Sequence, residues 1–181
     1  DDLLGRLAVE PNKKLLESSI KNKNICITGA GGSIGTELCK QVLLNAPKSL
    51  IMIDSSESNL YHLEEEIFSS NILKKNITPI SILGNVQDYL FIRDLFEKYN
   101  IDVIFHAAAY KHVPLIEKNP LAGIENNVFS TYSICKAAEY CKVKKVILIS
   151  TDKAVRPTNI MGTSKRIAEL IFQAFTDKVK S

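Results

Sequence analysis

Short runs of consecutive apolar residues alternate along the chain with longer segments in which apolar residues recur every three or four positions. The runs are rich in β-branched residues, as strands buried on both faces of a parallel sheet require. The pattern predicts five strands, at "NICIT" (24–28), "LIMID" (50–54), "ITPISIL" (77–83), "DVIFHAA" (102–108) and "KVILIS" (145–150).

The segments between these runs carry apolar residues at helical spacing, which gives each predicted helix one face toward a core. These faces comprise Ile34, Leu38 and Val42; Leu60, Leu63 and Ile67; Val128, Tyr132 and Cys135; and Ile167, Leu170, Ile171 and Ala174. Residues 1–22 form a polar lead-in with a short helix near residues 13–20. The alternation predicts an α/β fold over residues 23–181, a Rossmann-like doubly wound parallel sheet with strand order 3-2-1-4-5.

Composition narrows the class of protein. With 181 residues, 45% of them hydrophobic and 24% charged, the chain can bury one sizeable core. The net charge of +3 is spread over separate lysine pairs, so we expect no nucleic-acid binding. The four cysteines and three histidines lack metal-ligand spacing, which predicts reduced core cysteines and no metal site. No apolar run approaches the roughly 18 residues of a membrane span, and no signal-peptide pattern is present.

The strongest local signal is the turn "TGAGGSIG" between the first strand and the helix that follows it. Gly29, Gly32 and Gly35 follow a strand and open a helix, so the amides of Ser33 and Ile34 can receive a pyrophosphate at the helix N-terminus. A glycine-rich turn alone is weak support for a nucleotide site, since it is also a way to make a tight turn.

A carboxylate in the right place strengthens the nucleotide interpretation. Asp54 ends the second predicted strand, 19 residues after Gly35, where it would bond an adenosine ribose and repel a 2′-phosphate. The cofactor expected is therefore NAD rather than NADP. Ligands of such sheets bind beyond the carboxyl ends of the strands, which adds further candidate positions to the site: Asn85, Val86, Ala107, Ala108, Ala109, Ser150 and Thr151.

Four longer motifs resemble those of extended short-chain dehydrogenase/reductases that modify nucleotide sugars: "TGAGGSIGTELCKQ", "HAAAYKHVPLIEKNP", "NNVFSTY" and "ISTDKAVRPTNIMGTSKRIAE". Within that group they look like bacterial UDP-N-acetylglucosamine 4,6-dehydratases of polysaccharide and protein-glycan synthesis. The "DLLGR" of Asp2–Arg6 and Met161, which replaces a tyrosine, resemble the membrane-linked branch. This likeness implies a homo-oligomeric parent on the cytoplasmic face of the inner membrane, anchored by helices upstream of this chain.

The resemblance also implies roles for individual residues. The glycine turn would hold the pyrophosphate, Asp54 the ribose, Asn85 and Val86 the adenine, and Lys111 and Asn127 the nicotinamide half, with Lys111 and His112 toward a UDP-sugar substrate. Many relatives have aspartate where this chain has Asn85. An amide still hydrogen-bonds adenine, so cofactor binding remains the expectation.

A 4,6-dehydratase oxidises sugar C4, eliminates the C6 hydroxyl with the C5 proton and returns the hydride to C6. Elimination needs a base and an acid within reach of neighbouring carbons. The family pattern assigns Lys153 as base and Asp152 as acid, so burial and nearby charge would have to tune both groups. The competing interpretation of this pair is a structural ion pair at a strand end.

Oxidation at C4 also needs a group that takes the hydroxyl proton. In most relatives a tyrosine does so beside a lysine four residues on, whereas here Met161 precedes Lys165. We hypothesise that Lys165 binds the nicotinamide ribose while Thr151, a water or the Asp152–Lys153 pair takes the proton. Met161 alternatively only packs against the nicotinamide ring.

Other functions remain open at this point. A sugar epimerase or reductase of the same superfamily would share the cofactor half, and a non-catalytic NAD-binding scaffold would fit the missing tyrosine. The resemblance also implies that relatives continue with another strand and a substrate domain. We therefore expect this chain to be the cofactor-binding part of a longer protein, soluble and cytoplasmic on its own, weak in NAD binding and inactive by itself.

Overall fold

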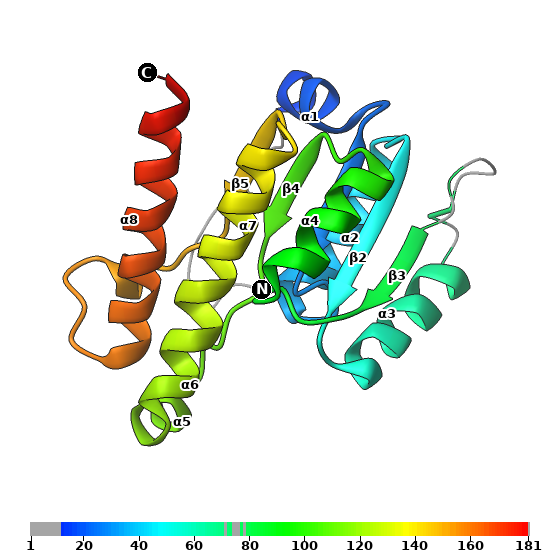
Figure 1. Cartoon of the computed structure of the whole chain (residues 1–181). Helices are drawn as coiled ribbons and strands as arrows, with labels where there is room; N and C mark the ends of the chain where they lie inside the picture. Colours follow the sequence, from blue (N-terminus) through cyan, green and yellow to red (C-terminus); the bar gives the residue numbers. More distant parts are fainter. Residues whose placement is uncertain (1–11, 71, 74–76, 78, 181) are drawn as a thin grey trace.

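The computed structural model describes residues 12–70, 72–73, 77 and 79–180. One parallel sheet forms the centre, with strand order β3-β2-β1-β4-β5 and helices on both faces (Figure 1). The strands are β1 Asn24–Thr28, β2 Ser49–Asp54, β3 Pro79–Leu83, β4 Val103–His106 and β5 Lys145–Leu148. The predicted class and strand order are confirmed.

Helices and short helical turns connect the strands. They are α1 Lys13–Ile20, α2 Ser33–Leu44, α3 Glu57–Ser69, α4 Tyr89–Tyr99, α5 Val113–Lys118, α6 Pro120–Ile124, the π-helix η1 Glu125–Phe129, α7 Ser130–Tyr140, the 3-10 turn η2 Asp152–Ala154 and α8 Ile160–Lys180. Side-chain caps explain several starts, because Asn12, Ser56 and Asp88 accept the backbone N–H three residues on. The short helix expected at residues 13–20 is confirmed.

Alternation along the strands divides the apolar residues between two cores. Ile25 and Ile27 of β1 pack with α2 and α3 on one face, while Cys26 packs with α4 and α7 on the other. All three are fully buried, because a central parallel strand has covering helices on both sides. Leu60, Leu63 and Ile67 confirm the predicted inner face of α3.

Two predictions about strands need correction. β4 ends at His106 and β5 at Leu148, so the segments 102–108 and 145–150 are longer than the strands within them. β3 and β5 form the two edges of the sheet and are only partly buried. Edge strands lack a neighbour on one side, so their apolar residues are less enclosed than the sequence pattern suggested.

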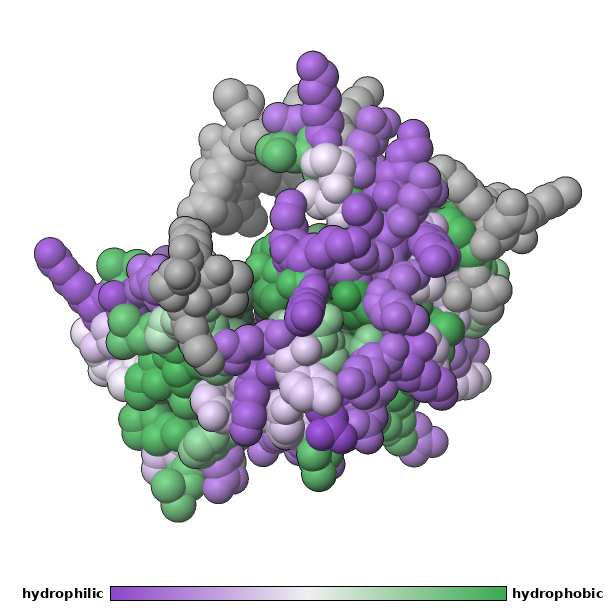
Figure 2. All heavy atoms as spheres, turned by 45° about the horizontal axis from the view of Figure 1, so that its top comes forward, coloured by the Kyte–Doolittle hydropathy of each residue, from purple (hydrophilic) through white to green (hydrophobic). Residues whose placement is uncertain are grey.

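Several residues expected on inner helix faces are exposed. Ile34, in the first turn of α2, is 53% exposed, and Tyr132 on α7 is 43% exposed. Ile167, Leu170 and Ala174 of α8 are also exposed. Figure 1 shows α8 beyond the β5 edge, and Figure 2 shows hydrophobic residues on the side where α7 and α8 lie. α8 is a helix as predicted, but much of its apolar stripe has no partner within the described part of the chain.

No helix in the described ranges is long and apolar enough to cross a membrane. Asp2–Arg6, on which the likeness to a membrane-linked branch partly rests, lies outside the described residues. The division into a lead-in and a cofactor domain therefore remains a prediction.

Candidate nucleotide site

Strand register brings the carboxyl ends of neighbouring strands to one edge of the sheet. Thr28, the last residue of β1, pairs with Ile53 of β2 and with His106 of β4. Beyond this edge lies a cavity of about 250 Å³. It is lined by the glycine turn, Asp54, the segment after β3 and the alanines after β4: Gly29, Gly32, Asp54, Gly84, Asn85, Val86, Ala107, Ala108 and Ala109. The predicted cofactor residues from four strand ends therefore meet at one cavity.

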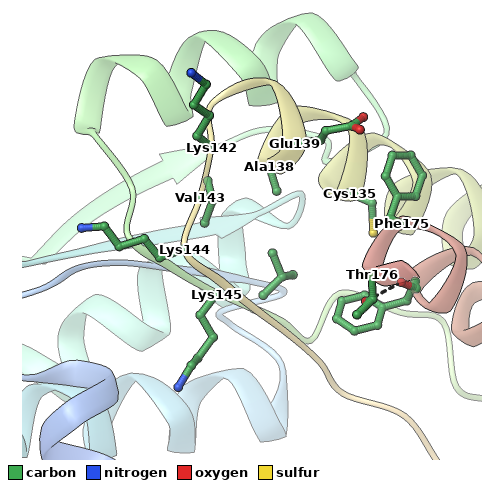
Figure 3. A pocket seen from close by; sticks show the side chains of 11 residues that line it. Cys135, Ala138, Glu139, Lys142, Val143, Lys144, Lys145, Phe175 and Thr176 are labelled. Carbon is green, nitrogen blue, oxygen red and sulfur yellow. Dashed lines mark hydrogen bonds between the residues drawn. The ribbon is translucent and has the colours of Figure 1, made fainter. Parts of the chain in front are cut away.

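A larger cavity, of about 630 Å³, lies beside the first residues of β5. It is therefore at the amino ends of the strands, opposite the carboxyl ends where the smaller cavity lies. Figure 3 shows Cys135 of α7 and Phe175 and Thr176 of α8 beside it, with the amino groups of Lys142 and Lys145 directed away. None of the residues predicted for the site lines this cavity. Ligands of open parallel sheets bind at the carboxyl edge, so the smaller cavity is the candidate site.

The glycine turn is as tight as its sequence suggests. Gly29 has a φ of +66°, and a Cβ there would lie 2.6 Å from the Cα of Ala108. A Cβ on Gly35 would lie 2.0 Å from the Gly29 carbonyl oxygen, so α2 starts directly against the turn. Gly32 is less tightly packed, because a Cβ added there would have the Gly29 carbonyl oxygen as its nearest neighbour, at 3.3 Å. Of the residues predicted in this turn, Gly29 and Gly32 line the cavity, whereas Ser33, Ile34 and Gly35 of α2 do not. The open space at Gly32, just before the N-terminus of α2, suits a diphosphate.

Asp54 is 9% exposed at the end of β2, and both of its oxygens accept backbone hydrogen bonds. Oδ2 accepts from the Gly31 N–H at 2.9 Å and Oδ1 from the Ser56 N–H at 2.9 Å. The carboxylate therefore links the glycine turn to the start of α3 and keeps lone pairs for a ribose hydroxyl. The negative charge of this carboxylate disfavours a 2′-phosphate, and none of the described residues that line the cavity is a lysine or an arginine.

Sequence reasoning missed four polar residues of this cavity, which are Ser55, Ser56, Asn59 and Asn126. The first three lie on the "DSSESN" stretch that follows Asp54. That stretch has a capping pattern, and Ser56 indeed accepts the Asn59 N–H at 3.3 Å. These polar residues were visible in the sequence, but helix capping explains their presence without any ligand.

The segment after β3 is held in a defined turn. Asn85 Oδ1 accepts the Gln87 N–H at 2.9 Å, and the Asn85 carbonyl accepts the Asp88 N–H at 3.1 Å. Ser133 of α7 donates to the Gln87 carbonyl at 2.8 Å. Val86 is 7% exposed and packs in the core on the α4 side. The Val86 side chain therefore anchors the segment while its backbone and the Asn85 amide line the cavity.

Asn127 does not face the cavity as expected. Its Oδ1 accepts the Tyr110 N–H at 2.7 Å, and its Nδ2 donates to the Tyr110 carbonyl at 3.1 Å and to Ser164 Oγ at 2.9 Å. The carboxamide is 1% exposed. Asn127 therefore joins the loop after β4 to α8, and any effect on a cofactor passes through these two segments.

His106 is buried beneath the same region and hydrogen-bonds at both ring nitrogens. Nδ1 lies 2.6 Å from Thr28 Oγ1 and Nε2 lies 3.2 Å from Thr131 Oγ1. Thr131 donates its own proton to the Asn127 carbonyl, so His106 Nε2 is the donor to Thr131 and Nδ1 accepts from Thr28. Burial lowers the His106 pKa to about 3, with Lys165 as a secondary cause. The ring is therefore neutral and connects β1, β4 and α7.

Lys111 and His112 lie apart from the main cavity. Both are exposed at the start of α5 and line a neighbouring cavity of about 390 Å³ together with Leu115 and Ile116. Ala109 and Tyr110 line both cavities, so the loop after β4 separates them. The predicted substrate residues thus lie beside the nucleotide cavity, on the far side of that loop.

The predicted acid and base lie on η2, directly after β5. Thr151 accepts the Lys153 N–H at 3.4 Å and donates to Asp152 Oδ1 at 3.0 Å. Asp152 and Lys153 are exposed. The Thr151 hydrogen bond lowers the pKa of Asp152, so its carboxyl is ionised in this open arrangement. No ion pair joins Asp152 and Lys153 among the salt bridges of the described residues, and the structural ion-pair interpretation is therefore not supported.

The first turns of α8 pack directly on η2. A Cβ on Gly162 would lie 2.3 Å from the Lys153 carbonyl oxygen, so only glycine fits this contact. Met161 is 3% exposed and Lys165 7% exposed, one helical turn apart. Lys165 Nζ donates to the Ile149 carbonyl at 2.8 Å, and burial lowers its pKa. Ser150 donates to Glu169 Oε1 at 2.5 Å. The five predicted catalytic residues are thereby brought to one end of β5.

Comparison with known proteins identifies the family. Residues 25–181 match the family described as "Polysaccharide biosynthesis protein". The chain belongs to this family. It is 39% identical over 177 residues to "Capsular polysaccharide biosynthesis protein CapD" of Staphylococcus aureus, covering 98% of this chain and 29% of that protein. It is 35% identical over 156 residues to "UDP-N-acetylglucosamine 4,6-dehydratase (inverting)" of Campylobacter jejuni, covering 84% of this chain and 43% of that protein.

The fold agrees with solved structures of the same superfamily. The UDP-glucose 4-epimerase of Bifidobacterium longum, in complex with NAD⁺ and UDP, matches with a TM-score of 0.71 and 25% identity over 83% of this chain and 48% of the epimerase. The relatives thus include a nucleotide-sugar dehydratase and a nucleotide-sugar epimerase, and the NAD⁺ complex supports NAD binding in this superfamily. The chain spans less than half the length of these polysaccharide biosynthesis relatives.

Proposed function

We propose that this chain is the NAD-binding part of a UDP-N-acetylglucosamine 4,6-dehydratase. The observation that carries the proposal is the close contact of Gly162 with the Lys153 carbonyl. It joins η2, which contains Asp152 and Lys153, to the first turns of α8, which contain Met161 and Lys165. The chain is 35% identical to a protein named for this activity, which supports the same assignment.

The residues of the cavity fit NAD. The backbone at Gly29 and Gly32 suits the diphosphate, Asp54 a ribose and the segment 84–86 the base. NAD supplies the hydride acceptor at sugar C4 and the hydride donor at C6.

In this proposal the two exposed groups on η2 perform the elimination. Lys153 takes the C5 proton and Asp152 protonates the departing C6 hydroxyl. Because the Thr151 hydrogen bond lowers the Asp152 pKa, the acid role requires a bound sugar that displaces water and raises this pKa again. Lys165 donates to a nicotinamide ribose, while Thr151, a water or the Asp152–Lys153 pair takes the C4 hydroxyl proton that a tyrosine takes elsewhere.

The test is product analysis with the full-length protein that contains this chain. Incubation with UDP-N-acetylglucosamine should give a 4-keto-6-deoxy sugar, observed by NMR, and Lys153→Gln should abolish it. Lys48→Gln is the matched control, because Lys48 is exposed and directly precedes β2, at the opposite ends of the strands from η2. A product epimerised at C4 would instead establish the epimerase alternative, and NAD binding without any product would establish a scaffold.

We further propose that the full-length protein is a membrane-linked homo-oligomer, on the resemblance of Asp2–Arg6 and Met161 to that branch. Membrane fractionation and light scattering of the full-length protein test the two parts separately. Recovery as a soluble monomer would contradict both.

A further inference from the structure

We infer that Glu169 is a positioning residue of the candidate site, which provides the counter-charge for the buried amino group of Lys165 and is held in place at the end of β5 by Ser150. Glu169 was not among the residues predicted for the site. Its effect on NAD rests on the proposed function, in which Lys165 donates to the nicotinamide ribose. The pairing of Glu169 with Lys165 does not depend on that function.

Two hydrogen bonds bring the side chains of Lys165 and Glu169 to the same place. Lys165 Nζ donates to the Ile149 carbonyl at 2.8 Å. Glu169 Oε1 accepts from Ser150 Oγ at 2.5 Å. Ile149 and Ser150 are consecutive residues just after β5. Because Lys165 and Glu169 are four positions apart on α8, their side chains also start from the same face of the helix. The ammonium group and the carboxylate are therefore neighbours at the end of β5.

The Glu169 carboxylate is fixed in direction by both of its oxygens. Oε1 accepts from Ser150, and Oε2 accepts from Arg166 Nη1 at 2.9 Å. The hydrogen bond from Ser150 is the main cause that lowers the pKa of Glu169, and the bond from Arg166 acts in the same direction. The side chain is only 27% exposed. A negative charge is thereby held at a defined point on α8 at neutral pH.

Lys165 needs such a charge because its ammonium group is buried. The residue is 7% exposed, and burial lowers its pKa while the charge of Glu169 opposes this effect. His106 of β4 is neutral and adds no negative charge. Among the described residues, Glu169 is the only charged group that contributes to the pKa of Lys165. The other charged residues on the elements packed against α8 are Glu117, Lys118, Glu125, Lys136, Glu139, Asp152 and Lys153.

Substitutions can separate the charge of Glu169 from its contact with Arg166. Glu169→Gln keeps an oxygen that accepts from Ser150 but removes the negative charge, so Lys165 should lose its proton at a lower pH than in the natural protein. Arg166→Gln is the matched control, because it breaks the same ion pair and leaves the carboxylate in place. It should not lower the pH at which Lys165 loses its proton.

The first measurement follows the proton of Lys165 directly. The full-length protein is labelled with trace acetic anhydride between about pH 6 and pH 11, and mass spectrometry gives the acetylation of Lys165 at each pH. Only the neutral amine reacts, so the midpoint of the labelling curve reports the pKa of Lys165. We expect this midpoint to lie lower in Glu169→Gln than in the natural protein and in Arg166→Gln. Circular dichroism verifies that each variant is folded.

The second measurement tests whether the charge affects the cofactor. A charged donor binds a hydroxyl group more strongly than a neutral one, so the dissociation constant of NAD should rise as Lys165 loses its proton. Calorimetry at several pH values gives this dependence for the same three proteins. We expect the rise to begin at a lower pH in Glu169→Gln, whereas a purely structural role of Glu169 would raise the dissociation constant equally at every pH.

Each result decides a different part of the inference. Equal labelling midpoints in the natural protein and in Glu169→Gln overturn the pairing with Lys165. An equal lowering in Arg166→Gln also overturns it, because the ion pair rather than the charge would then be responsible. A shifted midpoint without a shifted NAD curve overturns the role toward the cofactor. Failure of the natural protein to bind NAD overturns that role and the proposed NAD site, while the labelling still decides the pairing.

Discussion

Two regions at the carboxyl ends of the strands, one after β1 and β2 and the other after β5, are stabilised in different ways. Around β1 and β2, Asp54 ties the glycine turn to α3, and Gly29 and Gly35 pack so closely that no side chain fits. Beyond β5, the side chains of Asp152 and Lys153 are exposed, although the backbone beneath them is fixed by Gly162. The glycine turn is therefore held by its own contacts, whereas at η2 the backbone is packed and the side chains of Asp152 and Lys153 are exposed.

The largest test of this contrast is Gly35→Ala. The added methyl would lie 2.0 Å from the Gly29 oxygen, so the turn must move, which should destabilise the fold by about 3 kcal/mol in urea unfolding. Gly32→Ala is the control. Its methyl has only the Gly29 oxygen nearby, at 3.3 Å, and Gly32 is the N-cap of α2, so the unfolding free energy should fall by only about 1 kcal/mol. Equal losses in the two variants would refute the close-packed turn.

A second test lowers the pH, where His106 is the sensitive group. Its pKa is about 3 when folded, against 6.5 when unfolded, so the unfolded chain binds the proton first and stability falls as the pH drops below 6.5. Between pH 6.5 and pH 4.5 this group should lower the free energy of unfolding by roughly 2 kcal/mol. His106→Gln should be less stable at pH 7 but lose less on acidification. Parallel unfolding curves at both pH values for the two proteins would show that His106 is not buried in a neutral form.

A third test uses alkaline pH and concerns Lys165, which lies near the start of α8. Burial lowers the pKa of Lys165 below 10.5, so the unfolded chain holds its proton to higher pH than the folded chain. Stability should therefore rise with pH through the window between the folded pKa and 10.5, as the cost of burying the charge disappears. Lys165→Met removes this rise. Urea unfolding at pH 7 and pH 10 compares the two proteins, and an identical pH dependence would contradict a buried charged lysine.

The smallest expected effect concerns Thr151. Thr151→Val removes the hydrogen bond that is the main cause of the lowered Asp152 pKa, so this pKa should move upward toward its usual value. The carboxyl carbon shift in an NMR titration measures it directly. Thr176→Val, which removes a hydroxyl bonded to the Phe172 carbonyl far along α8, is the control and should leave the Asp152 titration unchanged.

Much of the fold was predictable because buried parallel strands are apolar whatever their neighbours are. The glycine turn and Asp54 were predictable for a similar reason, since their constraints are local in sequence. Asn127 was not, because its carboxamide bonds residues 17 and 37 positions away. The exposure of Ile34 and of the α8 stripe also escaped prediction, because periodicity shows which face of a helix is apolar but not whether anything covers that face.

The π-helix η1 has a consequence for how this chain can change over time. A π-helical turn holds one more residue than an α-helical turn, so deleting a single residue from Glu125–Phe129 would restore a regular helix and rotate Asn127 away from Tyr110 and Ser164. The number of residues between the loop after β4 and α7 is thus as constrained as their identity. In this segment, the deletion of one residue should therefore disturb the structure more than the substitution of one residue.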